Sequence, residues 1–166
     1  LTITGGNISG NGYGVYDVGK STVTINGGSI SGSYGVYDEG NSTVTINGGS
    51  ISGSYGVYDV ENSTVTINGG SISGFSGVYA KSNSTVTISG GIFSGNYGVY
   101  AADSTATISG GIFSGDTFGV AFSRTTVTIS GGIISGDSYD IHYYKSPITL
   151  IPGENGIGAT FPGGIT

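Results

Sequence analysis

Carboxylates recur at one position of the chain every 21 residues, and such groups can bind divalent cations or act as acids and bases. They are Asp17, Asp38 and Asp59, with Glu39 and Glu61 close by. Carboxylates about 5 Å apart repel one another unless water or a cation separates them. The series then ends, because Ala80 and Ala101 take the next two equivalent positions, and the chain has no D-x-D-x-D-G calcium loop. We therefore expect a solvated acidic corner rather than a calcium site, and no metal or other cofactor.

The residues from which an acid–base active site could be built are few. His142 is the single histidine and Arg124 the single arginine of the chain. His142 lies in the aromatic-rich segment 139–144, which accounts for it better than a role as general base. Polysaccharide lyases and hydrolases need clustered carboxylates, or a base beside Arg and Lys in a groove. We therefore expect that the chain is not an enzyme.

Threonines recur in Thr-x-Thr pairs, whose hydroxyl and methyl groups can order water. The pairs are Thr22 and Thr24, Thr43 and Thr45, Thr64 and Thr66, Thr85 and Thr87, Thr105 and Thr107, and Thr126 and Thr128. If they point outward, they form two parallel files about 6.6 Å apart, with about 4.8 Å between successive threonines of a file. This pattern resembles the face of insect and bacterial β-solenoid antifreeze proteins, although those insect proteins have shorter coils and disulfides, and this chain has no cysteine. The resemblance implies ice binding. The structural alternative is that threonine favours strands and stacks its hydroxyls in hydrogen-bonded columns.

The elements that carry these residues come from an internal repeat. Gly-Gly pairs begin at Gly5, Gly27, Gly48, Gly69, Gly90, Gly110 and Gly131, so successive pairs lie 22, 21, 21, 21, 20 and 21 residues apart. An eighth unit begins at Pro147, since Thr149 falls 21 residues after Thr128. Residues 1–151 are therefore a repeat region, and residues 152–166 are a segment that does not repeat.

Each unit alternates apolar and polar residues. In the second unit Val23 and Ile25 point one way and the threonines the other, as the period of a strand requires. A turn at 27–28 follows, and then two more short strands, at 29–31 and 34–37. One coil of three strands cannot bury its apolar face alone, but stacked coils can.

The units resemble the parallel β-helix repeats of bacterial surface and adhesin-like proteins, which carry T-I-x-G-G-x-I-S-G followed by a G-V-Y element. The resemblance covers about nine-tenths of the chain, through residue 151. It implies an all-β, right-handed parallel β-helix (β-solenoid) of about eight coils of ~21 residues, with three short strands in each. A fold of this kind identifies an architecture and says little about activity.

Composition excludes several classes of partner. The net charge is −6 and the basic residues number four, so a nucleic-acid partner is excluded, and no apolar run is long enough to insert into a membrane. The absence of cysteine excludes a disulfide scaffold and fits a secreted or cell-surface protein of bacteria. Because the chain starts at Leu1, we expect a fragment or a processed product.

Two files of aromatic residues follow the repeat. One contains Tyr13, Tyr34, Tyr55, Tyr97 and Phe118, and the other contains Tyr16, Tyr37, Tyr58, Tyr79 and Tyr100. Part of each ring should lie outside the solenoid. Exposed rings can stack on sugars, which would suit a glycan-binding adhesin, but mutual stacking along the rod is the role we expect.

A third surface feature is an apolar strip. Ile92, Ile112 and Ile133 follow the later Gly-Gly pairs, where the earlier units have serine, and alternation places them outside. Exposed apolar strips usually meet a partner. We expect residues 152–166, which carry Ile157, Phe161 and Ile165, to fold over this strip as a C-terminal cover; the alternative is contact with another chain.

These features together favour a structural or adhesive β-solenoid, secreted or at the cell surface, that acts as a rod-like scaffold or a self-assembling fibre subunit. Its partners would be itself, by head-to-tail stacking, or further coils of a longer protein. Ice binding through the Thr-x-Thr face is the first alternative, and glycan binding through the aromatic files is the second.

Overall fold

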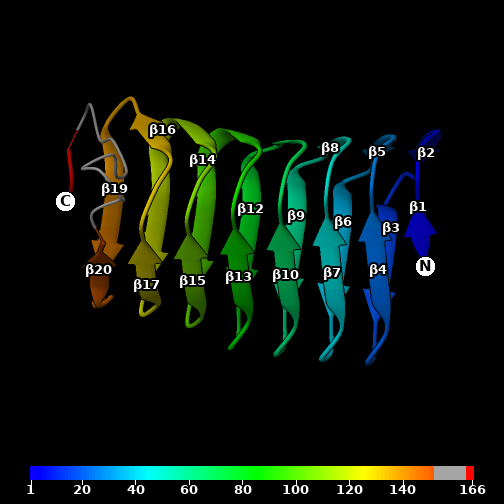
Figure 1. The fold of residues 1–166 in the computed structure, drawn as a ribbon, viewed down its shortest axis with the longest axis horizontal. Coiled ribbons are helices and arrows are strands. Elements are labelled where there is room, and N and C mark those ends of the chain that lie inside the picture. The colour runs from blue at the N-terminus through cyan, green and yellow to red at the C-terminus, as the bar shows by residue number, and fades with distance from the viewer. Residues whose placement is uncertain (152–163) are drawn as a thin grey trace.

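The computed structural model describes residues 1–151 and 164–166, and all the regular structure in them is β-strand. The strands at equivalent positions of successive units lie side by side along a rod (Figure 1). Every pairing between named strands is parallel and joins each unit to the next. The predicted parallel β-helix is confirmed, with about seven turns of ~21 residues, close to the eight coils expected.

Two sheets form the walls of the solenoid. The first holds the Thr-x-Thr strands in the order β1-β4-β7-β10-β13-β15-β17-β20. Its members are β1 (Thr2–Ile3), β4 (Thr22–Ile25), β7 (Thr43–Ile46), β10 (Thr64–Ile67), β13 (Thr85–Ile88), β15 (Thr105–Ile108), β17 (Thr126–Ile129) and β20 (Ile148–Leu150). With strands ~4.8 Å apart, this sheet is about 34 Å long.

The second sheet combines the other two strands of each unit and has twelve members. They are β2 (Asn7–Ser9), β3 (Tyr13–Val18), β5 (Ser29–Ser31), β6 (Tyr34–Glu39), β8 (Ser50–Ser52), β9 (Tyr55–Val60), β11 (Ser71–Ser73), β12 (Ser76–Lys81), β14 (Ile92–Ala102), β16 (Ile112–Ser123), β18 (Ile133–Gly136) and β19 (Tyr139–Tyr144). The predicted three strands per coil are present in most coils, but in β14 and β16 the second and third strands run together. An irregularity of register between Gly95 and Tyr97 replaces the corner there.

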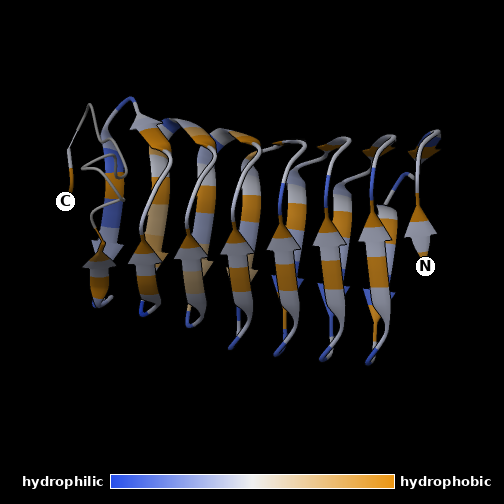
Figure 2. Ribbon diagram, in the orientation of Figure 1, coloured by the Kyte–Doolittle hydropathy of each residue, from blue (hydrophilic) through white to orange (hydrophobic). Residues whose placement is uncertain are grey.

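The core is the shaft between the two sheets, and hydropathic bands cross neighbouring strands in line (Figure 2). The inward valines and isoleucines predicted from alternation are buried; Val44 and Ile46, for example, have no exposed surface. Later in the rod Phe93 and Phe113 replace isoleucine in one column, and their rings stack 4.7 Å apart. The unit with Phe113 also has Ala106 where other units have valine, which offsets part of the added volume.

Polar columns use the same register. The side-chain amide of Asn68 donates to Asn47, and that of Asn47 to Asn26, each over 2.8 Å, so these asparagines form an amide ladder before the glycine turns. At the opposite corner Asn62 and Asn83 adopt positive φ, a conformation that asparagine tolerates better than most residues. Each coil therefore repeats its turn as well as its strands.

The C-terminal end is held by Asp140, a buried residue on β19. Its carboxylate accepts hydrogen bonds from the backbone N–H of Gly136, at 3.1 Å, and of Gly164, at 3.0 Å. Ile165 forms a parallel bridge with Ile141, so 164–166 pair with β19. Residues 152–163 of the predicted cover lie outside the described residues.

Glycine is required where coils approach most closely. A Cβ on Gly56 would lie 2.6 Å from the carbonyl oxygen of Gly77 and 2.6 Å from Ile72 Cγ2. The same contact recurs at Gly35 with Gly56 and Ile51, because the register is conserved from coil to coil. The backbone oxygen cannot move without breaking the parallel ladder.

We predict that Gly56→Ala destabilises the protein by roughly 2–3 kcal/mol, because the new methyl group overpacks the shaft against a fixed carbonyl. The free energy of unfolding from a denaturant melt measures this effect.

Gly12→Ala is the matched control, since a Cβ there would meet nothing within 4 Å. Equal stability of the two variants would show that the coils are not packed as closely as this register requires.

Candidate functional site

The Thr-x-Thr pairs form a continuous outer surface on the first sheet. Threonine pairs with threonine in register: Thr64 lies beside Thr43 and Thr85, and Thr66 beside Thr45 and Thr87. All twelve threonines are partly or fully exposed, whereas the residues between them are buried. The outward orientation predicted for both files is therefore what the structure shows.

The hydroxyls of these twelve threonines have no side-chain hydrogen bond to protein within the described residues, where Thr125 is the one threonine whose hydroxyl does. The hydrogen-bonded hydroxyl columns of the structural alternative are thus not formed. The face offers its hydroxyls to solvent or to a ligand, beside methyl groups held at a regular spacing.

The aromatic files stack along the rod, as expected. Tyr37, Tyr58, Tyr79 and Tyr100 have ring centroids 5.0–5.1 Å apart and interplanar angles of 2–20°. Rings of the two files also meet edge to face, as between Tyr34 and Tyr58 at 5.1 Å. Such pairs stabilise the sheet beyond their area burial.

The stacking also limits what the aromatic surface can bind. A sugar ring needs an open aromatic face, and a tyrosine such as Tyr58 has rings of its own file on both sides. Burial and the neighbouring Glu39 carboxylate raise the pKa of Tyr37, so this hydroxyl is protonated at neutral pH.

The apolar strip lies on the second sheet. Ile92, Ile112 and Ile133 pair in register and are 51%, 47% and 50% exposed, in the column where earlier coils have Ser50 and Ser71. Gly164–Thr166 pair with β19 rather than with this strip. The expected contact between the strip and residues 152–163 falls outside the described residues and stays a prediction.

The prediction that the aspartates form a solvated corner is wrong. Asp17, Asp38 and Asp59 are 3%, 0% and 0% exposed and stack in register inside the solenoid. Alternation explains this placement: Val36 points inward, so Asp38, two residues later on the same strand, points inward as well. The sequence did contain a signal that this column is buried, because the small apolar residue Ala80 continues it in the next coil.

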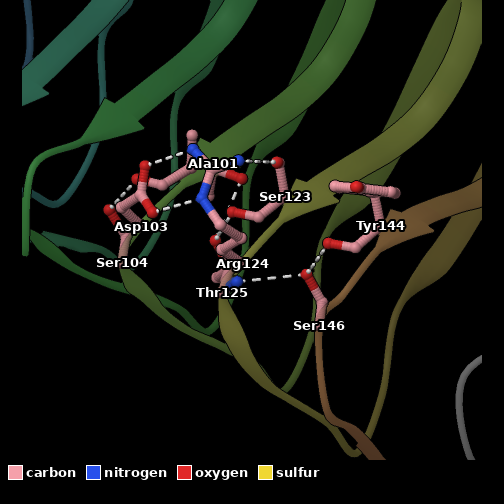
Figure 3. Close-up of polar contacts among 9 residues, drawn as sticks. Ala101, Asp103, Ser104, Ser123, Arg124, Thr125, Tyr144 and Ser146 are labelled. Atoms are coloured by element: carbon pink, nitrogen blue, oxygen red, sulfur yellow. Dashed lines mark hydrogen bonds and ion pairs between the residues drawn. The ribbon is translucent and has the colours of Figure 1, made fainter.

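A polar network joins the turns that precede the Thr-x-Thr strands in the C-terminal coils (Figure 3). Arg124 donates from Nε and Nη2 to the two carboxylate oxygens of Asp103, each over 2.6 Å, and this hydrogen-bonded pair lowers the pKa of Asp103. Thr125 Oγ1 lies 3.0 Å from the carbonyl oxygens of Ala101 and Ser123, and the Thr125 N–H donates to Ser146. Both members of the ion pair are about half exposed, so it contributes little to stability.

His142, the other candidate for acid–base chemistry, is also engaged in a packing contact. The ring of His142 stacks on Phe118 at 4.6 Å with an interplanar angle of 13°, which is the aromatic role expected of the last coil. Among residues 1–151 and 164–166, no three histidine or acidic side chains come together in a way that could hold a metal ion. In the same residues no helix has the length and hydropathy to cross a membrane.

The parallel register, the stacking of coil on coil and the repeated turns are the features of a parallel β-helix. Residues 1–131 match the family described as the right handed beta helix region. The chain belongs to the right-handed β-helix family. Neither a curated protein nor a solved structure matches it. The family contains enzymes as well as proteins without catalytic activity, so membership explains the architecture of this β-helix and leaves its activity to its surfaces.

We predict that the triple variant Ile92→Ser, Ile112→Ser and Ile133→Ser keeps the fold and binds much less of a fluorescent dye that recognises apolar surface. Serine already occupies this outward column at Ser50 and Ser71, so the loss of stability should be under about 1 kcal/mol per site.

The buried control is Ile72→Ser, which should cost roughly 3–5 kcal/mol because it leaves a cavity and an unsatisfied hydroxyl. Unchanged dye binding by the triple variant would mean that the strip is covered in solution.

Proposed function

We propose that this β-helix is a rod-like structural segment, secreted or displayed at the cell surface, which acts as a scaffold or as the subunit of a fibre. The observation that carries the proposal is the register that repeats from coil to coil: in both sheets, apart from the shift between Gly95 and Tyr97, outward as well as inward residues lie over their equivalents in the next coil. Such a ladder resists bending and grows by one coil at a time. An adhesive role fits the same geometry, because a rod holds a binding surface away from its point of attachment.

The edge of the solenoid supports assembly. Within the described residues β1, β2 and β3 each pair on one side, with β4, β5 and β6. Their free backbone groups can accept another parallel strand, from further coils or from a second copy stacked head to tail. Val18 and Tyr16 are about half exposed on the same edge and would be covered by such a coil.

The proposal includes no catalytic role. Arg124 is engaged with Asp103, His142 is stacked on Phe118, and Asp38 and Asp59 are enclosed in the shaft. These contacts occupy the single arginine, the single histidine and the buried aspartates, which are groups that acid–base catalysis could use.

We predict that inserting three extra copies of segment 43–63 after residue 63 lengthens the rod by about 14 Å and leaves its cross-section unchanged. Small-angle scattering measures both quantities. Electron microscopy of the unaltered protein then separates the two structural roles, because long fibres indicate self-assembly and discrete particles indicate a spacer.

A control insertion of residues 43–53 alone adds about half a coil and should abolish the ordered rod. The scaffold proposal fails if the three full units unfold the protein or leave its length unchanged.

Ice binding is a second candidate, favoured by one observation: the threonines of the two files are in register and at least partly exposed, and in the described part of the chain their hydroxyls make no hydrogen bond to protein. Methyl and hydroxyl groups repeated at about 4.8 Å along the rod and about 6.6 Å across it form a regular lattice that can order water.

If ice binding is the function, the protein shows thermal hysteresis at millimolar concentration, and Thr45→Tyr with Thr66→Tyr removes it by breaking the flat face. Ser52→Tyr with Ser73→Tyr, on the second sheet, is the matched control and should keep it. The absence of hysteresis in the unaltered protein would end this proposal.

A further inference from the structure

The most unusual feature of the interior is a column of three carboxyl groups. Asp17, Asp38 and Asp59 lie on β3, β6 and β9, in register and fully enclosed. Neighbouring strands of a sheet are ~4.8 Å apart, so each carboxyl group has another within a few ångströms. In a medium of low dielectric constant, three negative charges at this spacing would repel strongly.

The column has few compensating contacts. Ser21 donates to Asp17 Oδ1 and Ser42 to Asp38 Oδ1, but the second oxygen of each aspartate has no protein partner among the described residues. Neither oxygen of Asp59 accepts a well-formed hydrogen bond from the described residues, since Ser63 donates to the carbonyl of Val60 instead. Burial raises the pKa of Asp59 by more than the Ser84 hydroxyl lowers it. A buried carboxylate without a partner is far less stable than the neutral acid.

The surroundings supply no positive charge. The strands of the opposite wall, β4, β7 and β10, direct only valine and isoleucine into the shaft. The ionisable side chains at the same corner are exposed or half-buried and alternate outward; they are Lys20, Glu39, Glu61 and Lys81, with the tyrosines Tyr16, Tyr37 and Tyr58 on the same strands. Two of the four charged groups are acidic, so they do not offset the column.

A proton is the occupant that fits this environment. Calcium requires six to eight oxygen ligands, and the described residues provide no cluster of three carboxylates that could hold a metal ion. Burial, and then the Asp38 charge, raise the pKa of Asp59 to about 8, while burial raises that of Asp38 to about 6. Neutral carboxylic acids can donate to the unpartnered oxygens next to them.

We propose that Asp38 and Asp59, stacked in register beside Asp17, form a shared proton-binding site inside the solenoid, which makes the stability of the coils that carry β6 and β9 depend on pH. The folded chain holds protons on this column that the unfolded chain releases. Because Ala80, Ala101 and Phe122 continue the column, the later coils lack this dependence.

The direction follows from the raised pKa values. An aspartate with a pKa of 3.8 when unfolded and about 8 when folded stabilises the fold fully below pH 3.8, and the contribution is lost as pH rises through 8. Asp38 loses its smaller contribution between 3.8 and about 6. The N-terminal coils are therefore most stable in mild acid and loosen in weak alkali, the reverse of an ordinary salt-bridged carboxylate.

The test is the unfolding equilibrium constant from denaturant melts between pH 5 and pH 8. For the unaltered protein the unfolding equilibrium constant should rise on the order of a thousandfold across this range, mostly through Asp59. In the double variant Asp38→Ala and Asp59→Ala the rise should fall below about threefold, since the two shifted groups are gone. Alanine is chosen because Ala80 and Ala101 show that the column accepts it. Asp116→Asn, at an exposed position, is the control and should keep the full pH dependence.

Carbon-13 NMR titration of the aspartate carboxyl groups in the unaltered protein gives an independent measurement if the variants do not fold. Midpoints well above 4 for two carboxyl groups would support the proposal, and midpoints near 4 for all of them would overturn it. Stability that is flat or rising between pH 5 and pH 8 would also overturn it. So would a calcium-dependent rise in melting temperature at pH 8 that the double variant lacks, because a cation would then compensate the charge.

Discussion

The parallel backbone ladder between coils is the constraint on which the rest of this molecule depends. It places each residue beside its equivalent 20 to 22 positions away, so a side chain meets its own kind wherever the repeat is kept. A chain with few charges and many glycines can bury a continuous core this way, because Gly56 and its equivalents let neighbouring coils approach closely within the second sheet. Stability then comes from contacts between neighbouring coils rather than from any one coil.

Stacking identical side chains stabilises the fold for some residue types and destabilises it for others. Asparagines gain from it, since each amide both donates and accepts, as in the ladder from Asn26 to Asn68. Aromatic rings are stabilised as well, because the tyrosines of a file stack face to face. Carboxylates lose, because identical charges are brought together in a place that water does not reach. The replacement of aspartate by alanine after Asp59 relieves that repulsion.

Side chains that contact their equivalents in neighbouring coils stabilise the fold, whereas those without such contacts remain available to bind a partner. The threonine files keep their hydroxyls available, and the isoleucines after the later glycine turns remain exposed. The stacked tyrosine files, the single arginine and the single histidine are engaged in contacts within the rod. Because most reactive side chains are engaged within the rod, the architecture supports a structural scaffold, and the threonine hydroxyls are its most accessible polar groups.

The sequence by itself determined the period, the parallel stacking and the two sides of the Thr-x-Thr strand, because strict alternation such as that of Val44 and Ile46 leaves one way to bury the apolar residues. Tertiary structure decided what local patterns leave open. The second and third strands join one sheet, Asp140 holds the chain end at Gly164, and the aspartate column lies inside. Asp38 was misplaced because aspartate is usually exposed, whereas its true position is set by the inward Val36 two residues earlier and by the coil above it. Burial of a charged residue depends on what surrounds it, and only the assembled coils supply those surroundings.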